Sequence, residues 1–248
     1  MNKLFVRQIS IEKELPRDNY ISKLPVVKSL VEKPIDFKKP VTFFVGENGV
    51  GKSTLIEALA IALDFNAEGG SRNFCFSTED SHSALSEYLT VAKGPILSED
   101  GYFLRAESFY NVATHIDELD RQPCGAPFIV DGYGGVSLHK QSHGESFMRL
   151  VEERFGGNGI YILDEPEAAL SPMRLLRLMS NIKRLVEKNS QFIISTHSPI
   201  LMAFPDADIF EIKGEEIVNT PFEETEHYRV TKNFLDNPQR TFRHLFED

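Results

Sequence analysis

The sequence contains only two cysteines among 248 residues, and they lie far apart. Cys75 and Cys124 belong to no Cys-x-x-Cys pair, the spacing typical of zinc sites and redox-active disulfides. The sequence therefore argues against a disulfide framework and against a cysteine-based zinc site.

Long hydrophobic runs are also lacking. No run of about eighteen apolar residues exists, and the best candidate, after the glycine loop, is broken by Glu57 and Asp64. The opening residues, MNKLFVRQIS, lack the apolar region of a secretory signal. We therefore expect no membrane-spanning helix and a cytoplasmic location.

Positive charge is not in excess, because the formal net charge is -10. Such a chain as a whole does not indicate nucleic-acid binding. Residues 1–40, however, hold nine Lys or Arg against five acids, a balance of +4, so the remainder carries -14. This basic stretch would suit phosphates or a partner, and solvated lysines on a strand edge explain it equally well.

The hydrophobic content of 41% is normal for a folded domain. Residues 160–163 and 191–195 predict short strands, while residues 146–155 and 172–188 have helical spacing. Strands that alternate with helices indicate an α/β fold with a mainly parallel central sheet flanked by helices on both faces. We expect one such domain over residues 1–248.

The N-terminal part is less regular. Residues 4–11 predict a strand of an antiparallel N-terminal portion. Residues 16–40 are punctuated by proline and predict loops and short extended pieces.

Residues 64–140 are rich in Gly, Ser, Asn and acids, which indicates an inserted, peripheral subdomain rather than the centre of the sheet. Strand-like islands occur at 101–106 and 128–130, and a helix is expected near 83–92. The C-terminal tail, 211–248, predicts a hairpin and one short helix, and its role is not legible from the sequence.

The most specific motif is a phosphate-binding loop. Residues 46–53, GENGVGKS, fit G-x-x-x-x-G-K-[ST] without substitution, and they lie between an apolar strand at 41–45 and a buried helix at 54–63. Backbone N–H groups of such a loop surround phosphate oxygens, and the helix points its positive end at them. The residues expected to bind the phosphates of a nucleoside triphosphate are Gly46, Glu47, Asn48, Gly49, Val50, Gly51, Lys52, Ser53 and Thr54.

A second set of residues suits hydrolysis. Asp164 and Glu165 follow the strand at 160–163, where Asp164, together with the Ser53 hydroxyl, would hold Mg²⁺ and Glu165 would deprotonate the attacking water. His197 follows the strand at 191–195, at the edge where ligands of open α/β sheets bind, and would donate to the γ-phosphate or the water. We expect Glu165 and His197 to be catalytic.

A second anion site is expected in front of the helix at 146–155. The segment Gln141-Ser142-His143-Gly144-Glu145 offers a hydroxyl and a glycine backbone at a helix N-terminus.

The ordered set GENGVGKS, QSHGE, YILDEP, EAALSP and STHSP resembles the ATP-binding-cassette (ABC) ATPases, from Walker A through signature, Walker B and D-loop to H-loop. The resemblance covers roughly residues 41–201. The EPEAALSP form is more similar to soluble members than to transporter subunits. Those members are the heads of chromosome-maintenance and repair ATPases and the stand-alone predicted ATPases of bacteria.

The resemblance implies a homodimer in which two chains enclose two ATP molecules, each site pairing the Walker motifs of one chain with the signature of the other. Ser142, Gly144 and Glu145 would then act in trans, and residues 168–171 would be the D-loop. Tyr20 lies near the position of the family's adenine-stacking aromatic, although a core tyrosine is an equal alternative.

The sequence departs from the family at two places. The signature commonly reads Leu-Ser-Gly-Gly-Gln, and here Gln141, His143 and Glu145 replace three of its residues. The Q-loop glutamine has no clear match, with Glu107 and Gln122 as candidates.

Three functions fit these features. The first is an ATPase switch that closes a dimer on ATP, opens it on hydrolysis and drives a protein partner not identified by the sequence. The second is an ATP-gated DNA-binding protein, supported by the basic N-terminal stretch and by a polar stripe at Arg174, Arg177, Asn181, Arg184 and Lys188. The third is the energy subunit of a transporter.

Overall fold

The computed structural model describes residues 4–16, 19–72, 84–107, 109–121 and 142–246, and also residues 128, 130, 131, 135, 137 and 139. Its centre is a six-stranded sheet in the order β5-β6-β7-β3-β8-β9. The strands are β5 (Asp100–Arg105), β6 (Gly159–Asp164), β7 (Gln191–Ser195), β3 (Val41–Gly46), β8 (Asp208–Lys213) and β9 (Glu216–Asn219). Neighbours from β5 to β8 are parallel, and β8 pairs with β9 in antiparallel fashion. The predicted mainly parallel sheet is confirmed.

A smaller antiparallel sheet, in the order β2-β1-β4, lies beside it. It contains β2 (Ile35–Asp36), β1 (Val6–Ile11) and β4 (Leu89–Lys93). The predicted antiparallel N-terminal portion is therefore confirmed. Gln191, at the start of β7, joins the two sheets, because its amide oxygen accepts from the backbone N–H groups of Phe5 and Val6 and its nitrogen donates to the Val6 carbonyl.

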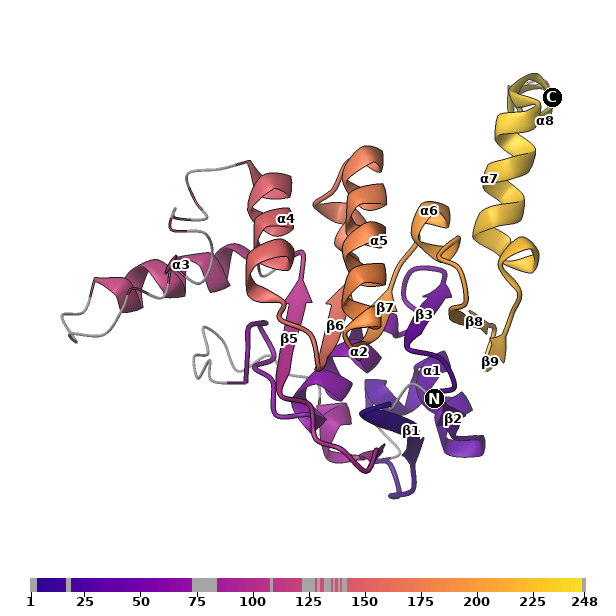
Figure 1. Cartoon of the computed structure of the whole chain (residues 1–248). Coiled ribbons are helices and arrows are strands. Elements are labelled where there is room, and N and C mark those ends of the chain that lie inside the picture. The colour runs from indigo at the N-terminus through magenta and orange to yellow at the C-terminus, as the bar shows by residue number, and fades with distance from the viewer. Residues whose placement is uncertain are drawn as a thin grey trace.

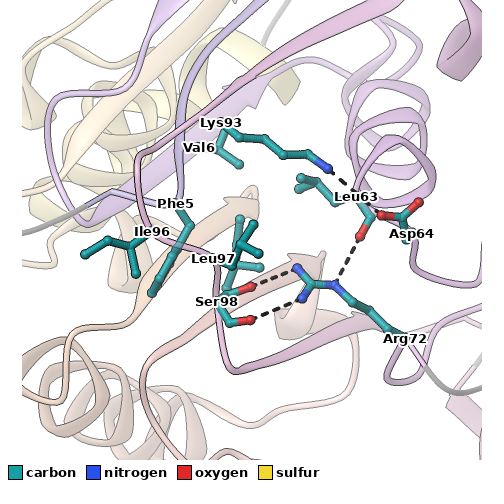
Figure 2. A pocket seen from close by; sticks show the side chains of 10 residues that line it. Phe5, Val6, Leu63, Asp64, Arg72, Lys93, Ile96, Leu97 and Ser98 are labelled. Atoms are coloured by element: carbon teal, nitrogen blue, oxygen red, sulfur yellow. Dashed lines mark hydrogen bonds and ion pairs between the residues drawn. The ribbon is translucent and has the colours of Figure 1, made fainter.

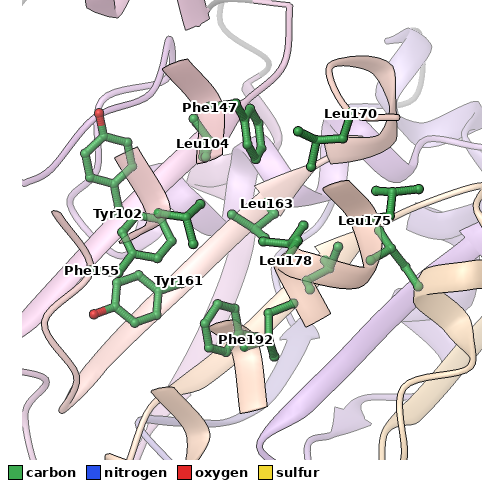
Figure 3. Close-up of a cluster of buried hydrophobic side chains, with 14 of the residues drawn as sticks. Tyr102, Leu104, Phe147, Phe155, Tyr161, Leu163, Leu170, Leu175, Leu178 and Phe192 are labelled. Atoms are coloured by element: carbon green, nitrogen blue, oxygen red, sulfur yellow. The ribbon is translucent and has the colours of Figure 1, made fainter. Parts of the chain in front are cut away.

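Side chains alternate along each strand of the central sheet, so each strand contributes residues to both faces. Both faces are covered by other elements. Residues such as Phe43, Tyr161 and Phe192 pack under the first helical layer, and Phe44, Ile162 and Ile193 face the second. The first layer is formed by α3 (Phe109–Asp120), α4 (His143–Arg154), α5 (Pro172–Glu187) and α6 (Pro199–Met202). Figure 3 shows Leu178 of α5 next to Leu163 of the sheet, with Leu175 and Phe192 in the same buried cluster.

The opposite face is covered by α1 (Pro25–Glu32), α2 (Lys52–Ala62) and the smaller sheet. Figure 1 shows α4 and α5 on one side of the central strands and α1, β1 and β2 on the other. Leu55, Ile56 and Leu59 of α2 are fully buried between the two sheets. The predicted strand, loop and buried helix around residue 50 are thereby confirmed.

Two predictions for the N-terminal half are wrong. Residues 25–32 form α1 instead of a loop, because Pro25 occupies the first helical position, where proline favours a helix start. The helix expected near 83–92 is replaced by the short 3-10 turn η2 (Ala84–Glu87) and strand β4. The β-branched Thr90 and Val91 of β4 pair with β1 across the small sheet.

The region 64–140 is not wholly peripheral. β5 pairs with β6 along its full length, and Tyr102 and Phe103 are fully buried, so the 101–106 island is an edge strand of the central sheet. Helix α3, which the sequence did not predict, extends to one side in Figure 1. The 128–130 island lies mostly outside the described residues, and the inserted subdomain as a whole stays a prediction.

The tail contains the predicted hairpin, β8–β9, but two helices follow it instead of one. After η6 (Phe222–Glu224) come α7 (Glu226–Asp236) and α8 (Pro238–Phe246), which lead away from the sheet to the C-terminus. None of the helices in the described part of the chain is long and apolar enough to cross a membrane.

Candidate nucleotide-binding site

The phosphate loop joins β3 to α2. Its three glycines have positive φ angles, 148° at Gly46, 83° at Gly49 and 97° at Gly51. This backbone is strained for other residues, and a Cβ on Gly51 would lie 2.7 Å from Val26 Cγ1 of α1. The loop conformation therefore requires glycine at position 51, where α1 packs against the loop. In this conformation the N-terminus of α2 points toward the inside of the loop.

Lys52 is buried, with 4% of its surface exposed, and its ammonium lies inside the loop. Nζ donates to the carbonyls of Gly46 at 2.9 Å and Glu47 at 2.8 Å. Burial lowers its pKa, although Glu165, Asp164 and Glu167 act in the opposite direction. The cation thus interacts with three carboxylates at the end of β6 and just after it.

Asp164 ends β6 and is 4% exposed. Ser195 Oγ of β7 donates to its Oδ1 at 2.5 Å, and the Ser53 hydroxyl also hydrogen-bonds to it. Burial raises the pKa of Asp164, and both hydroxyls and Arg105 oppose that rise. The fold therefore brings the two predicted Mg²⁺ ligands, Ser53 and Asp164, into contact.

This oxygen pair fits Mg²⁺, which takes one or two protein oxygens and completes its shell with phosphate and water. Within the described residues, no group of three or more His, Cys, Asp or Glu side chains could hold a metal by itself.

Arg105, at the end of β5, was not predicted as a site residue. Its guanidinium lies 2.7 Å from Glu57 Oε2 of α2, 3.3 Å from Asp164 Oδ2 and 3.6 Å from Glu107 Oε2. Glu57 and Asp164 are almost fully buried, so Arg105 supplies the positive charge that two buried carboxylates require. Parallel pairing of β5 with β6, which places Arg105 opposite Asp164, could not be read from the motifs.

Glu165 has a left-handed backbone, with φ 47° and ψ 55°. Such a conformation costs a non-glycine residue about 1–3 kcal/mol and persists where the surroundings fix it. Here the Glu165 N–H donates to Ser195 Oγ at 3.1 Å and to the Ser195 carbonyl at 3.2 Å. The backbone of the residue predicted to be the base is thus held by the end of β7.

His197 lies beside Glu165, with 3.5 Å between His197 Nε2 and Glu165 Oε1. Glu167, a residue that the sequence analysis did not select, accepts from the His197 backbone N–H at 2.5 Å. Burial raises the pKa of Glu167. The other ring nitrogen, His197 Nδ1, lies 3.0 Å from Nε2 of His227 in α7, a contact that no sequence motif indicated.

The predicted signature residues are not part of this cluster. Ser142 precedes α4, and its Oγ donates to Glu145 Oε2 at 2.7 Å. Glu145 also lies 3.4 Å from Arg174 of α5. Figure 1 shows α5 between α4 and the end of β3, so the start of α4 is well separated from the phosphate loop of the same chain.

Gly144 contacts the predicted D-loop of its own chain. A Cβ on Gly144 would lie 2.8 Å from the Ala169 carbonyl and 2.4 Å from Arg174 Nη1. The turn η5 (Pro166–Ala168) directly follows Glu165, and the predicted D-loop, residues 168–171, begins at the last residue of this turn. The signature and D-loop regions of one chain therefore pack against each other.

Tyr20 is 59% exposed, so the alternative of a core tyrosine is wrong. It opens the turn η1 (Tyr20–Lys23), which leads into α1 beside Gly51. Its role in adenine stacking stays a prediction. Of the two Q-loop candidates, Glu107 follows β5 and contacts Arg105, while Gln122 lies outside the described residues.

A separate hollow of about 260 Å³ lies at the other end of α2, next to Leu63 and Asp64. Figure 2 shows Arg72 in it, donating to the Leu63 carbonyl and to the carbonyl and hydroxyl of Ser98, while Lys93 faces Asp64. These groups link α2 to the loop before β5. Because the donors of Arg72 and Lys93 are engaged within the chain, we interpret the hollow as a structural feature and not as a ligand site.

The loop, the buried lysine and the Ser53–Asp164 pair at the carboxyl edge of a parallel sheet define a P-loop nucleotide-binding protein. Two protein-family profiles match the chain. Residues 27–109 match "AAA domain", and residues 139–203 match "AAA domain, putative AbiEii toxin, Type IV TA system".

Curated relatives are import proteins. The cobalt import ATP-binding protein CbiO of Salmonella paratyphi A is 29% identical over 70% of this chain and 66% of its own length. The ribose import ATP-binding protein RbsA of Yersinia pestis is 28% identical over 65% of this chain. The chain spans about a third of RbsA, since the match covers 34% of it.

Solved structures with a similar course include cbiO1 from Clostridium perfringens, at 20% identity and a TM-score of 0.47, covering 98% of this chain and all of that one. The SMC head domain from Thermotoga maritima aligns at 18% identity and a TM-score of 0.45 over 88% of this chain and all of that one. The motifs, the profile matches and the curated relatives together support an ABC-type P-loop ATPase.

Proposed function

We propose that the chain binds ATP with Mg²⁺ and hydrolyses it at a site completed by a second copy of itself. The observation that carries this proposal is the cluster of Lys52, Ser53, Asp164, Glu165 and His197 at one sheet edge, with Ser142 and Gly144 outside it at the start of α4. One chain thus supplies the Walker half of one site and the signature half of another. Two chains together would complete both sites.

In this scheme each side chain has one task. Backbone N–H groups of residues 46–53 and the Lys52 ammonium bind the phosphates, while Ser53 and Asp164 would hold Mg²⁺, which neutralises phosphate charge when bound. Glu165 accepts the proton of the attacking water, and the His197 Nε2–H donates to the γ-phosphate or to that water. In the dimer, Ser142, Gly144 and Glu145 approach the γ-phosphate of the ATP that is bound to the partner chain.

Glu145 makes this second half unusual. A carboxylate next to the expected phosphate position is electrostatically unfavourable, and Arg174 at 3.4 Å offsets part of its charge. The Ser142 hydroxyl donates to this carboxylate and would have to turn from it to reach a phosphate. We infer that ATP closes the dimer less strongly than a neutral residue at position 145 would allow.

The proposal is tested by phosphate release from the purified chain with ATP. We expect release that requires Mg²⁺ and disappears in Lys52→Ala, because the buried cation of the loop is lost. Lys183→Ala, which removes an exposed lysine of α5 paired with Glu187, is the matched control and should retain the wild-type rate. Equal release by wild type and Lys52→Ala would contradict the proposal.

An importer energy subunit is a second candidate, favoured by the import function in the names of CbiO and RbsA. Co-purification with a membrane protein would distinguish it from a switch with a soluble partner. The DNA-binding alternative has lost support, because Arg174 and Arg177 of the polar stripe pair with Glu145 and Glu152 of α4. In the basic N-terminal stretch, Lys28 and Lys39 likewise pair with acids.

A further inference from the structure

Helix α7 begins beside the catalytic cluster and is firmly held there. Thr225, fully buried, caps it by accepting from the Tyr228 N–H at 3.4 Å. The Glu226 N–H donates to Glu211 Oε1 of β8 at 2.8 Å. The next residue, His227, is thereby fixed in the first turn of the helix, and its ring reaches His197.

The two rings share one proton. His197 Nδ1 and His227 Nε2 are 3.0 Å apart, a hydrogen-bond distance that requires a donor on one side and an acceptor on the other. Burial lowers the pKa of His197 to about 4, with further lowering by Lys52 and His227. Burial and Lys52 also lower the pKa of His227. Both rings are therefore neutral near pH 7.

The position of Glu165 determines which of the two histidine rings donates the hydrogen bond between them. If His197 Nδ1 carried the proton, its bare Nε2 lone pair would face Glu165 Oε1 at 3.5 Å, which is repulsive. If His227 Nε2–H donates instead, His197 carries its proton on Nε2 and directs it toward the carboxylate. The second arrangement is favoured, and it also gives the Nε2–H donor that the proposed chemistry needs.

Among the described residues, His197 Nε2 is not engaged by a close acceptor. It is buried, and no hydrogen-bond partner is found for it within the described part of the chain, since 3.5 Å to Glu165 is long for such a bond. A donor that is aimed at the base and not yet engaged is suited to a phosphate oxygen or a water.

We propose that His227 is a positioning residue, which holds His197 in the Nε2–H tautomer and in the orientation required to contact the γ-phosphate or the attacking water. This inference rests on the proposed function. Because His227 belongs to α7, which leads toward the C-terminus, displacement of α7 would release the tautomer and slow the reaction (Figure 1).

The test compares His227→Leu, which removes the donor, with His227→Gln, whose side-chain amide keeps an N–H near the position of Nε2. Long-range ¹H–¹⁵N correlation spectra of the free protein report the tautomer of His197, whose signal is assigned with a His197→Gln variant. The kcat and KM for ATP are measured on the same samples.

We expect Nε2–H at His197 in the wild type and in His227→Gln, and a mixture of tautomers in His227→Leu. Removing a partner that orients a functional side chain costs about 10- to 100-fold, so kcat should fall by that factor in His227→Leu with KM nearly unchanged. His227→Gln should recover most of this loss.

A wild-type His197 with its proton on Nδ1 would overturn the inference, and so would an unchanged tautomer and kcat in His227→Leu. Equal losses in both variants would assign His227 a purely structural role. If the spectra agree but no variant and not even the wild type hydrolyses ATP, the proposed function fails while the tautomer contact stands.

Discussion

Glu165→Gln is expected to lower the rate of ATP hydrolysis by about 10²- to 10⁴-fold, the range associated with loss of a general base. The amide has nearly the same shape, so the strained turn after β6 and its bonds to Ser195 should persist. Lys52, Ser53 and Asp164 remain in place, and nucleotide binding should therefore survive.

The same variant should accumulate as an ATP-bound dimer, because binding closes the two chains and hydrolysis no longer opens them. Phosphate release gives the rate, and light scattering after size exclusion gives the mass with ATP and Mg²⁺. Glu187→Gln, at an exposed carboxylate of α5, is the matched control. A wild-type rate would count against Glu165 as the base, and a variant that stays monomeric with ATP and Mg²⁺ would count against the ATP-closed dimer.

Arg105→Leu is expected to destabilise the folded chain by about 3 kcal/mol, since removing one partner of a buried ion pair leaves the other charge uncompensated. Two buried acids lose the same guanidinium here, because Arg105 pairs with both Glu57 and Asp164. For a chain of this size the loss corresponds to a Tm lower by about 6–12 °C.

Thermal or denaturant unfolding measures this effect. Arg177→Leu removes a guanidinium from an exposed pair with Glu152 and should cost less than about 1 kcal/mol. The double variant Arg105→Leu with Glu57→Leu should recover part of the loss, since one of the two buried carboxylates that faced Arg105 is gone. Equal stabilities of Arg105→Leu and Arg177→Leu would show that Arg105 does not neutralise the buried acids.

The strands that carry the motifs could be predicted from sequence because their signals are local. Residues 41–45, 160–163 and 191–195 are apolar runs that end in Gly46, Asp164-Glu165 and Thr196-His197, and the structure places all three strands side by side. Because parallel strands end at the same edge of the sheet, the residues that follow these three strands lie close together. The motifs at the strand ends were therefore enough to predict that the Walker and H-loop residues meet.

The remaining site residues depend on pairing and packing that no local pattern encodes. Arg105 meets Asp164 only because β5 joins the sheet next to β6. His227 meets His197 because the β8–β9 hairpin returns the chain to the sheet before α7 begins. Helix α1 was missed because Pro25 was interpreted as a loop signal, whereas it starts the helix.

The central claim is that one chain holds two halves of different sites, and mixing two inactive variants tests it most directly. Lys52→Ala disables the phosphate loop, and Ser142→Asp repels the γ-phosphate while keeping a residue that caps helices well. Each variant alone should be inactive. In an equal mixture with random pairing, half of the dimers are mixed and each has one intact composite site, so activity should return to about a quarter of the wild-type value. No recovery on mixing, or full activity of Ser142→Asp alone, would contradict a site shared between two chains.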